Sequence, residues 1–164
     1  MDPVTVSVTV GRPREEVFGY LLDVANHPEF TDHFLKDWHL TRVESSGRGA
    51  GARFRVDAPL TRFGWADITF TEVEPPHRIV EVGRGGKFNR IRQRGEWRLD
   101  PGSGGTTRVT FTLETIPALP SDRILEIFAG RRWFKRRLNR ALRRLRSILE
   151  ENRDRGRRAT IAGR

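Results

Sequence analysis

Three histidines are the first residues in the sequence that could bind a metal or transfer a proton. His27, His33 and His39 are six residues apart, with Asp32 and Asp37 between them. A six-residue step on a helix turns the side chain to another face, and no HxH or HxxxH pair occurs. The spacing therefore predicts no metal site. The histidines are expected to cap elements or face solvent, except that His39 could point inward from the start of a strand.

Other patterns that carry chemistry are sparse. The chain has no Cys, which excludes thiol catalysis, disulfides and thiolate metal sites. The GRGGK segment at 83–87 lacks the glycine spacing and hydroxyl residue of a phosphate-binding loop, and we interpret it as a hairpin turn. A general acid or base needs a buried carboxylate in a cleft, and Asp37, Asp57, Asp67 and Glu81 are equal candidates. We predict no catalytic residue, no metal and no cofactor.

The elements that would position a site follow from the spacing of apolar residues. Valines alternate with Ser and Thr over 4–10, which predicts a strand. A helix is expected from Arg14 and a shorter one over 28–34. A long final helix is expected from Ser121, a good N-cap residue, to about Glu151. Between them lie six strand-like runs, at 38–43, 53–58, around 66–70, 79–82, 91–99 and 108–114.

The final helix is strongly basic. Residues 127–149 hold nine Lys or Arg and no Asp or Glu. Apolar residues recur there at helical spacing, which favours a helix that packs on the sheet and leaves its arginines in water. Two other interpretations stay open. Trp133 and its neighbouring arginines could contact an anionic membrane surface; nucleic-acid binding is less favoured, because no recognition motif accompanies the charge. The apolar stripe comprises Ile127, Phe134, Leu138, Ala141, Leu145 and Ile148.

Length and composition fit one domain. The 164 residues are 36% apolar and carry a net charge of +10, which favours anionic partners. Neither a signal peptide nor an apolar stretch of about 20 residues is present, so we expect a cytoplasmic protein. Residues 1–152 are expected to form the domain. Residues 153–164 are expected to be a disordered basic tail, since they have no apolar periodicity. The sequence sets no oligomeric state.

Four short patterns occur in an order that is typical of a known family. They are P-x-E-x-V at 13–17, D-x-x-x-x-P at 23–28, P-P-x-R at 75–78 and G-x-T-x-V at 105–109. The segments VTVSVTVGRPREEVFGYLLDVANHPEF, ITFTEVEPPHRIVEV and GEWRLDPGSGGTTRVTFTLE carry them, and the long final helix follows. Over about 3–150 the chain resembles the START-like superfamily, also called SRPBCC or helix-grip proteins. Within it, the chain is most similar to the polyketide cyclase/dehydrase and lipid-transport group.

The resemblance implies an α+β helix-grip fold. A seven-stranded antiparallel sheet would wrap around the long C-terminal helix, with two short helices after the first strand and an internal apolar cavity. Members bind lipids, sterols or polyketides; some are cyclases and many have no demonstrated activity, so the fold does not select a function. We expect non-catalytic binding or transport of a small hydrophobic ligand, such as a lipid, polyketide or isoprenoid-like molecule. The alternatives are a polyketide cyclase/dehydratase, and nucleic-acid or partner-protein binding through the basic helix.

Strand alternation predicts which side chains line that cavity. Apolar positions on one face of each strand should meet the apolar stripe of the helix, and such a pocket suits a lipid-like ligand. An error of one residue in register would turn a strand's whole set to the opposite face. The predicted lining is Phe54, Val56, Ile68, Phe70, Val80, Val82, Trp97, Leu99, Phe111 and Leu113 from strands, Phe134, Leu138, Leu142 and Leu145 from the helix, and Tyr20, His39 and Gln93 as polar groups.

Overall fold

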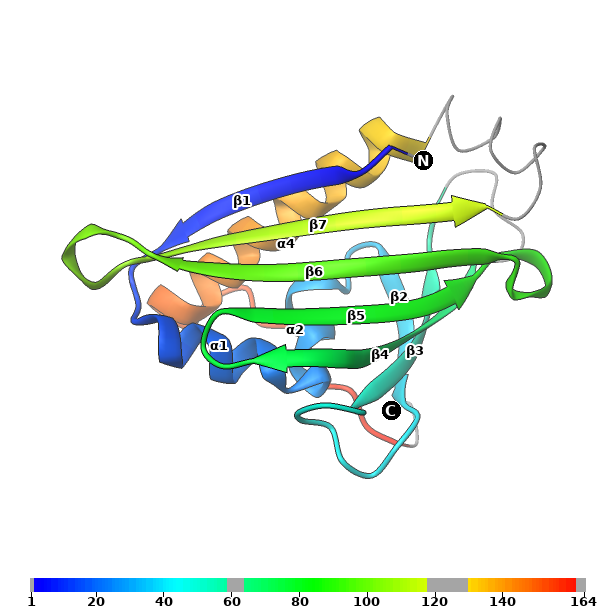
Figure 1. The fold of residues 1–164 in the computed structure, drawn as a ribbon, viewed down its shortest axis with the longest axis horizontal. Helices are drawn as coiled ribbons and strands as arrows, with labels where there is room; N and C mark the ends of the chain where they lie inside the picture. The colour runs from blue at the N-terminus through cyan, green and yellow to red at the C-terminus, as the bar shows by residue number, and fades with distance from the viewer. Residues whose placement is uncertain (1, 59–63, 118–129, 162–164) are drawn as a thin grey trace.

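The computed structural model describes residues 2–58, 64–117 and 130–161, and their elements follow the predicted order. The first strand, two short helices, six further strands and a final helix all appear (Figure 1). Short 3-10 helices also occur: η1 (Val24–Asn26), η2 (Lys87–Asn89) and η3 (Ser103–Gly105). The α-helices are α1 (Arg14–Leu22), α2 (His27–Thr31) and α4 (Arg131–Glu151). The strands are β1 (Val4–Val10), β2 (Leu35–Leu40), β3 (Gly51–Val56), β4 (Trp65–Glu74), β5 (Arg78–Gly85), β6 (Ile91–Pro101) and β7 (Thr107–Pro117).

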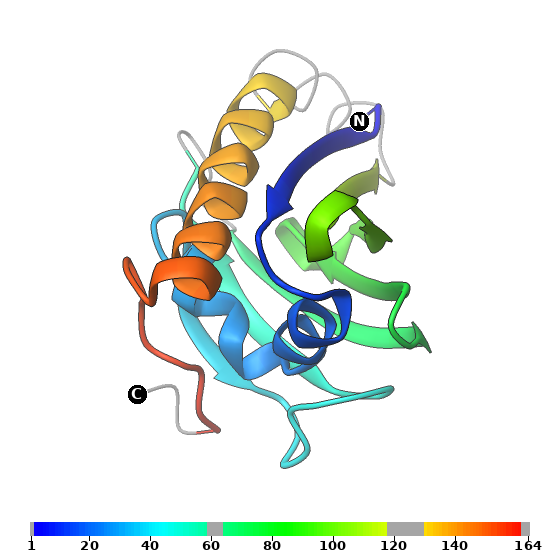
Figure 2. The same cartoon turned by 90° about the vertical axis from the view of Figure 1, so that its left-hand side faces the viewer.

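All seven strands form one antiparallel sheet in the order β1-β7-β6-β5-β4-β3-β2. The sheet curls, and its concave face holds the helices (Figures 1 and 2). Two irregularities interrupt the ladders, one in β4 between Phe70 and Glu72 and one in β2 between Lys36 and His39. Bulges of this kind increase the local bend of a strand. The predicted helix-grip architecture is confirmed.

Helix α4 buries its apolar stripe, as its sequence predicts. The helix packs against β1 and α2. Most of its arginines occupy the outer face, whereas Arg144 lies against α2 and pairs with Asp32. Packing of the stripe removes apolar surface from water, and this burial is the main source of stability in such a fold. The part of the predicted helix that precedes Gly130 lies outside the described residues. No helix in the described ranges is both long and apolar enough to cross a bilayer. The buried side chains of α4 are Leu138, Ala141, Leu142, Leu145 and Ile148.

The two short helices close the end of the sheet. Helix α1 has Glu15 and Glu16 in its first turn, where carboxylates complement the helix dipole. Asp23 then caps η1 by accepting a hydrogen bond from the Ala25 N–H at 3.1 Å. Helix α2 has Pro28 in its first turn and is buried along its whole length. All five of its residues therefore lie in the protein interior.

The C-terminal segment beyond α4 differs from the expected disordered tail. Residues 152–161 lie beside α2 and β2 (Figure 2). The Ala159 N–H donates to Ala25 O at 2.8 Å, and the Leu40 N–H donates to Thr160 O at 2.9 Å. Specific backbone and charge partners hold this segment, so the lack of apolar periodicity did not indicate disorder here.

Candidate functional site

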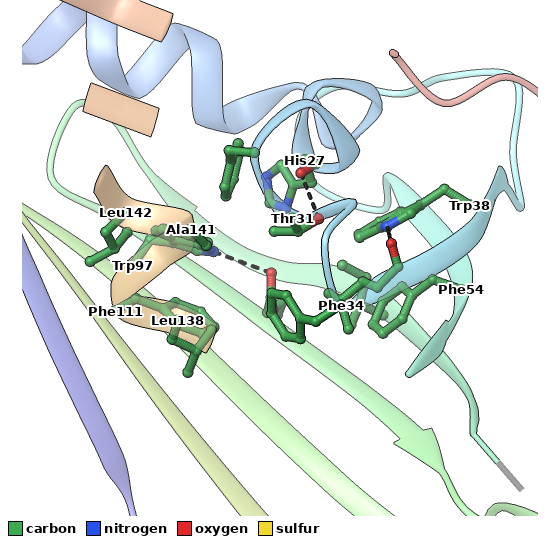
Figure 3. A pocket seen from close by; sticks show the side chains of 14 residues that line it. His27, Thr31, Phe34, Trp38, Phe54, Trp97, Phe111, Leu138, Ala141 and Leu142 are labelled. Carbon is green, nitrogen blue, oxygen red and sulfur yellow. Dashed lines mark hydrogen bonds between the residues drawn. The ribbon is translucent and has the colours of Figure 1, made fainter. Parts of the chain in front are cut away.

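A small internal cavity of about 50 Å³ lies between α2, α4 and the concave face of the sheet (Figure 3). The side chains around it are almost all apolar, and many are aromatic. A cavity of this kind favours apolar over polar ligands. Its lining comprises His27, Phe30, Thr31, Phe34, Leu35, Trp38, Phe54, Ile68, Glu81, Trp97, Phe111, Leu138, Ala141 and Leu142.

Two close, tilted aromatic pairs form the walls on the sheet side. The ring centroids of Trp97 and Phe111 are 4.2 Å apart, and those of Trp38 and Phe54 are 4.4 Å apart. Phe30 from α2 meets Trp97 edge-on at 6.1 Å. Such offset and edge-to-face contacts add specific geometry to a large buried area. The sheet side of the cavity is therefore lined by aromatic rings, as suits an apolar ligand.

One carboxyl group faces this apolar space. Glu81 of β5 is buried, and its Oε2 accepts a hydrogen bond from the Trp97 indole N–H at 3.2 Å, drawn as a dashed line from Trp97 in Figure 3. Burial raises the pKa of Glu81 to about 7, and the indole bond opposes this only in part. Gly95 lies opposite on β6, where a Cβ would lie 2.6 Å from Glu81 Cγ. The missing side chain of Gly95 thus makes room for the carboxyl.

His27 is the second polar group in the cavity wall. Its ring lies among Phe30, Phe70 and Trp97, with centroid distances of 5.5, 5.7 and 5.6 Å. The Nε2 atom is 2.9 Å from Leu21 O, so Nε2 carries the proton and donates it to that carbonyl. Burial lowers the pKa of His27 to about 4, and the ring is neutral at physiological pH.

The other two histidines of the six-residue series lie elsewhere. His33 contacts Arg137 O of α4 through Nε2 at 3.2 Å, and burial together with nearby arginines lowers its pKa to about 4. The ring of His39 lies 5.9 Å from that of Trp65, away from the cavity. Across the described residues, no group of three or more His, Asp or Glu side chains could hold a metal ion.

The structure brings part of the predicted lining together. Several other predicted residues contribute to the core without reaching the cavity: Phe70, Leu99 and Leu145 are buried, and Val56, Leu113 and Phe134 are partly buried. The amide of Gln93 donates to Asp67 O at 2.8 Å, and the Tyr20 hydroxyl donates to Glu29 Oε2 at 2.6 Å. The predicted residues that do line the cavity are Phe54, Ile68, Trp97, Phe111, Leu138 and Leu142.

The predicted register of β5 is wrong. Val80 and Val82 were expected to face the helix, but Ile79 pairs with Trp97 and faces inward together with Glu81. Val82 is 39% exposed on the other face. Because side chains alternate between the two faces of a strand, the inward face of β5 carries either the two valines or the isoleucine and the glutamate. The prediction took the two valines because both are apolar, and it was wrong. His39 is likewise on the outside.

Sequence reasoning missed the contribution of α2 and β2. Phe30, Thr31, Phe34, Leu35 and Trp38 all line the cavity. A helix of five residues that is buried all round gives no amphipathic signal, so its apolar residues could not be assigned to a face. The density of aromatic residues between 30 and 38 is the one signal that could have pointed to them.

Trp133, the predicted membrane contact, is half-buried. Its ring lies 5.9 Å from Phe34 and 5.0 Å from Phe134, and the Arg137 guanidinium lies 5.4 Å from its centroid. The indole therefore closes one end of the core, while the cations beside it remain outside. Contact of this surface with a membrane stays a prediction.

The sequence matches the family described as "Polyketide cyclase / dehydrase and lipid transport" over residues 1–150. The chain belongs to this family. The match spans every element from β1 to α4 and so includes the whole cavity. A search of curated proteins found no match.

Solved structures share the fold at low sequence identity. Protein TTHA0849 from Thermus thermophilus is 17% identical, with a TM-score of 0.71 over 92% of this chain and 99% of that one. A truncated norcoclaurine synthase from Thalictrum flavum is 11% identical, with a TM-score of 0.69 over 92% and 94%. DynU16, a putative protein in the dynemicin biosynthetic locus, is 21% identical, with a TM-score of 0.63 over 95% of this chain and 50% of that one.

Proposed function

We propose that the protein binds a small hydrophobic molecule, such as a lipid, polyketide or isoprenoid-like compound, in the cavity beneath α4. The observation that carries the proposal is a space between α2, α4 and the sheet whose walls are mostly aromatic and aliphatic side chains. Membership of a family described by polyketide and lipid chemistry supports it. Transfer of apolar surface from water into this space would drive binding, at about 25 cal/mol per Å².

The size of the cavity sets a condition on binding. A volume of about 50 Å³ holds only a few water molecules, so a lipid-like ligand has to displace side chains. Leu35, at the start of β2, is only partly buried. The wall at Leu35 in β2 is therefore the part expected to move, whereas Trp97 and Phe111 lie on interior strands of the sheet and are expected to stay.

Native mass spectrometry of the protein as isolated tests the proposal, followed by titration with decanol while tryptophan fluorescence is recorded. Trp38 and Trp97 both line the cavity, so a bound chain changes their emission. Ala141→Leu adds three carbon atoms inside the cavity and should abolish binding. Arg143→Leu adds apolar surface on the outer face of the same helix and should bind as the original protein does. Equal binding by the Ala141 variant would refute the proposal.

Glu81 favours a second candidate, general acid–base catalysis of cyclisation or dehydration. A carboxyl with a pKa of about 7 exchanges a proton readily near neutral pH. Trp97 holds its Oε2 in place, and the neutral His27 ring lines the same cavity. In this candidate Glu81 removes a proton next to a ligand carbonyl and returns it to the oxygen that leaves. The fold also carries an enzyme, norcoclaurine synthase.

A comparison of Glu81→Gln with the original protein tests this candidate, using cyclisation and dehydration of a linear poly-β-ketone to an aromatic ring as the reaction. Gln keeps the shape and the acceptor for Trp97 but cannot transfer the proton. Loss of turnover with unchanged ligand affinity would support catalysis by Glu81. Turnover that persists in the Gln variant would exclude it.

A further inference from the structure

A second, larger hollow lies outside the cavity, under the C-terminal segment. It has a volume of about 580 Å³ and runs between residues 155–159 and the stretch from Pro28 to Trp38. Two side chains, Leu35 and Trp38, line both this groove and the internal cavity. The two spaces are therefore separated by a wall that is one layer of side chains thick.

The outer wall of the groove is held in place by several bonds. The Gly156 N–H donates to Glu29 O at 2.9 Å, and Arg155 pairs with the buried Glu29 carboxylate at 2.8 Å. Glu29 also accepts the Tyr20 hydroxyl. A buried carboxylate with these partners anchors the segment firmly. The groove is consequently a formed feature of the fold.

Most charges around the groove are already paired. Asp32 pairs with Arg144 of α4, and Asp37 pairs with Arg55 at 2.7 Å. Arg155 and Arg158 pair with Glu29 and Asp23. Both carboxylates in the groove wall thus have their own cations.

Two cations of the groove are left over. Within the described residues, no carboxylate lies within ion-pair distance of Lys36 or Arg157, and both line the groove. Two cations of one groove that have no carboxylate partner attract an anionic group to the groove. The groove therefore has a net positive charge that the protein itself does not neutralise.

The wall between groove and cavity lies at the bulge of β2. Asp37 has a positive φ of 55° there, a conformation that costs a non-glycine residue about 1 kcal/mol or more. The Trp38 indole N–H donates to Leu35 O at 3.2 Å. At the bulge, pairing with β3 is interrupted between Lys36 and His39. Because β2 is an edge strand and its ladder to β3 is interrupted here, few ladder bonds have to break for a ligand to pass.

We propose that the ligand is a single-chain anionic amphiphile whose head group lies in the groove between Lys36 and Arg157. Its apolar chain passes Leu35 and Trp38 into the internal cavity. The head group is a carboxylate or a phosphate, since both accept charge-assisted hydrogen bonds from Lys and Arg. This inference rests on the proposed function, to which it adds the chemical class of the ligand and its direction of entry.

The test compares three ligands that share one chain: decanoate, decyl phosphate and decanol. Binding is measured by tryptophan fluorescence and by calorimetry, with the full-length protein and two double variants. Lys36→Gln/Arg157→Gln removes the two unpaired cations. Arg92→Gln/Arg108→Gln removes the same charge from exposed positions on β6 and β7 and serves as the control. Neither member of the test pair contacts a described carboxylate, so the test variant is expected to fold.

The original protein should bind at least one of the two anions more tightly than decanol. The Lys36/Arg157 variant should lose about fivefold or more of that anion's affinity and keep its affinity for decanol. The control variant should match the original protein. Whichever of decanoate and decyl phosphate binds more tightly identifies the head group as a carboxylate or a phosphate.

Two results would overturn the inference and leave cavity binding intact: anions that bind no better than decanol, or an equal loss for all three ligands in the test variant. If the original protein binds none of the three, the proposed function itself fails. The decanol arm therefore separates failure of the head-group site from failure of the cavity.

Discussion

Replacement of Glu81 by Gln should change how the stability of the protein depends on pH. The folded protein holds the Glu81 proton more tightly than the unfolded chain does, because burial raises the pKa from 4.5 to about 7. Between these two values the unfolded chain has released the proton and the folded protein has not. The unfolded chain then binds fewer protons, so the free energy of unfolding falls as pH rises.

The size of the effect follows from the two pKa values. Each pH unit between 4.5 and about 7 removes about 1.4 kcal/mol, or roughly 3 kcal/mol in total above pH 7. Gln keeps the acceptor for Trp97 and has no charge to bury. The Gln variant should therefore gain about 3 kcal/mol of stability relative to the original protein between pH 4.5 and pH 7.5.

His27 and His33 act in the opposite direction and hide this dependence in the original protein. Burial lowers the pKa of each from 6.5 to about 4, so their contribution to stability is complete above pH 6.5 and is lost as pH falls toward 4. Between about pH 4.5 and 6.5 their slopes oppose the slope of Glu81 and together exceed it. Only the difference between variant and original protein isolates Glu81.

Urea unfolding followed by tryptophan fluorescence at pH 4.5, 5.5, 6.5 and 7.5 measures this difference. Glu44→Gln, on an exposed loop, is the matched control and should give a flat difference. A flat difference for the Glu81 variant as well would refute the reasoning. So would a difference that grows in favour of Glu, since that would require a charged carboxylate stabilised in the cavity.

Three further changes test the packing. Leu145→Ala removes a fully buried side chain of α4 and should lower the free energy of unfolding by about 2–5 kcal/mol in urea, whereas Arg143→Ala on the outer face should change it by less than about 0.5 kcal/mol. Arg155→Gln leaves the buried Glu29 with one partner fewer and should lower the free energy of unfolding by about 1–3 kcal/mol, a loss that is kept small because Arg155 is partly exposed. Arg157→Gln breaks no ion pair and should leave the free energy of unfolding unchanged. Equal effects of the two changes would contradict the anchoring of the C-terminal segment. Gly95→Ala places a Cβ 2.6 Å from the Glu81 side chain, so it should lower the free energy of unfolding by about 1–3 kcal/mol in the original protein. The loss should be smaller in a Glu81→Ala variant, and a double-mutant cycle measures this coupling.

The architecture could be predicted because its signals are local. The valines of β1 alternate strictly, and the stripe of α4 repeats at helical spacing between Leu138 and Ile148. A half-buried strand and an amphipathic helix each record their burial in their own sequence. The order of these elements, together with the family patterns, was then sufficient for the helix-grip fold.

The chemistry of the site depends on distant residues and could not be predicted in the same way. Glu81 faces inward because Gly95 leaves space and Trp97 donates a hydrogen bond, and both lie on the next strand. Nothing within residues 78–85 indicates that the charged residue is the buried one. The C-terminal segment is similar, since Arg155 is held by Glu29, a residue 126 positions earlier in the chain.

Isotope-filtered NMR of the protein with bound decanoate tests the central claim most directly, because it locates the ligand chain without assuming a site. The account predicts intermolecular NOEs from the ligand's chain to side chains inside the cavity, Trp97, Phe111 and Leu142. NOEs confined to exposed residues such as Val43 or Phe88, with none to the cavity, would contradict it.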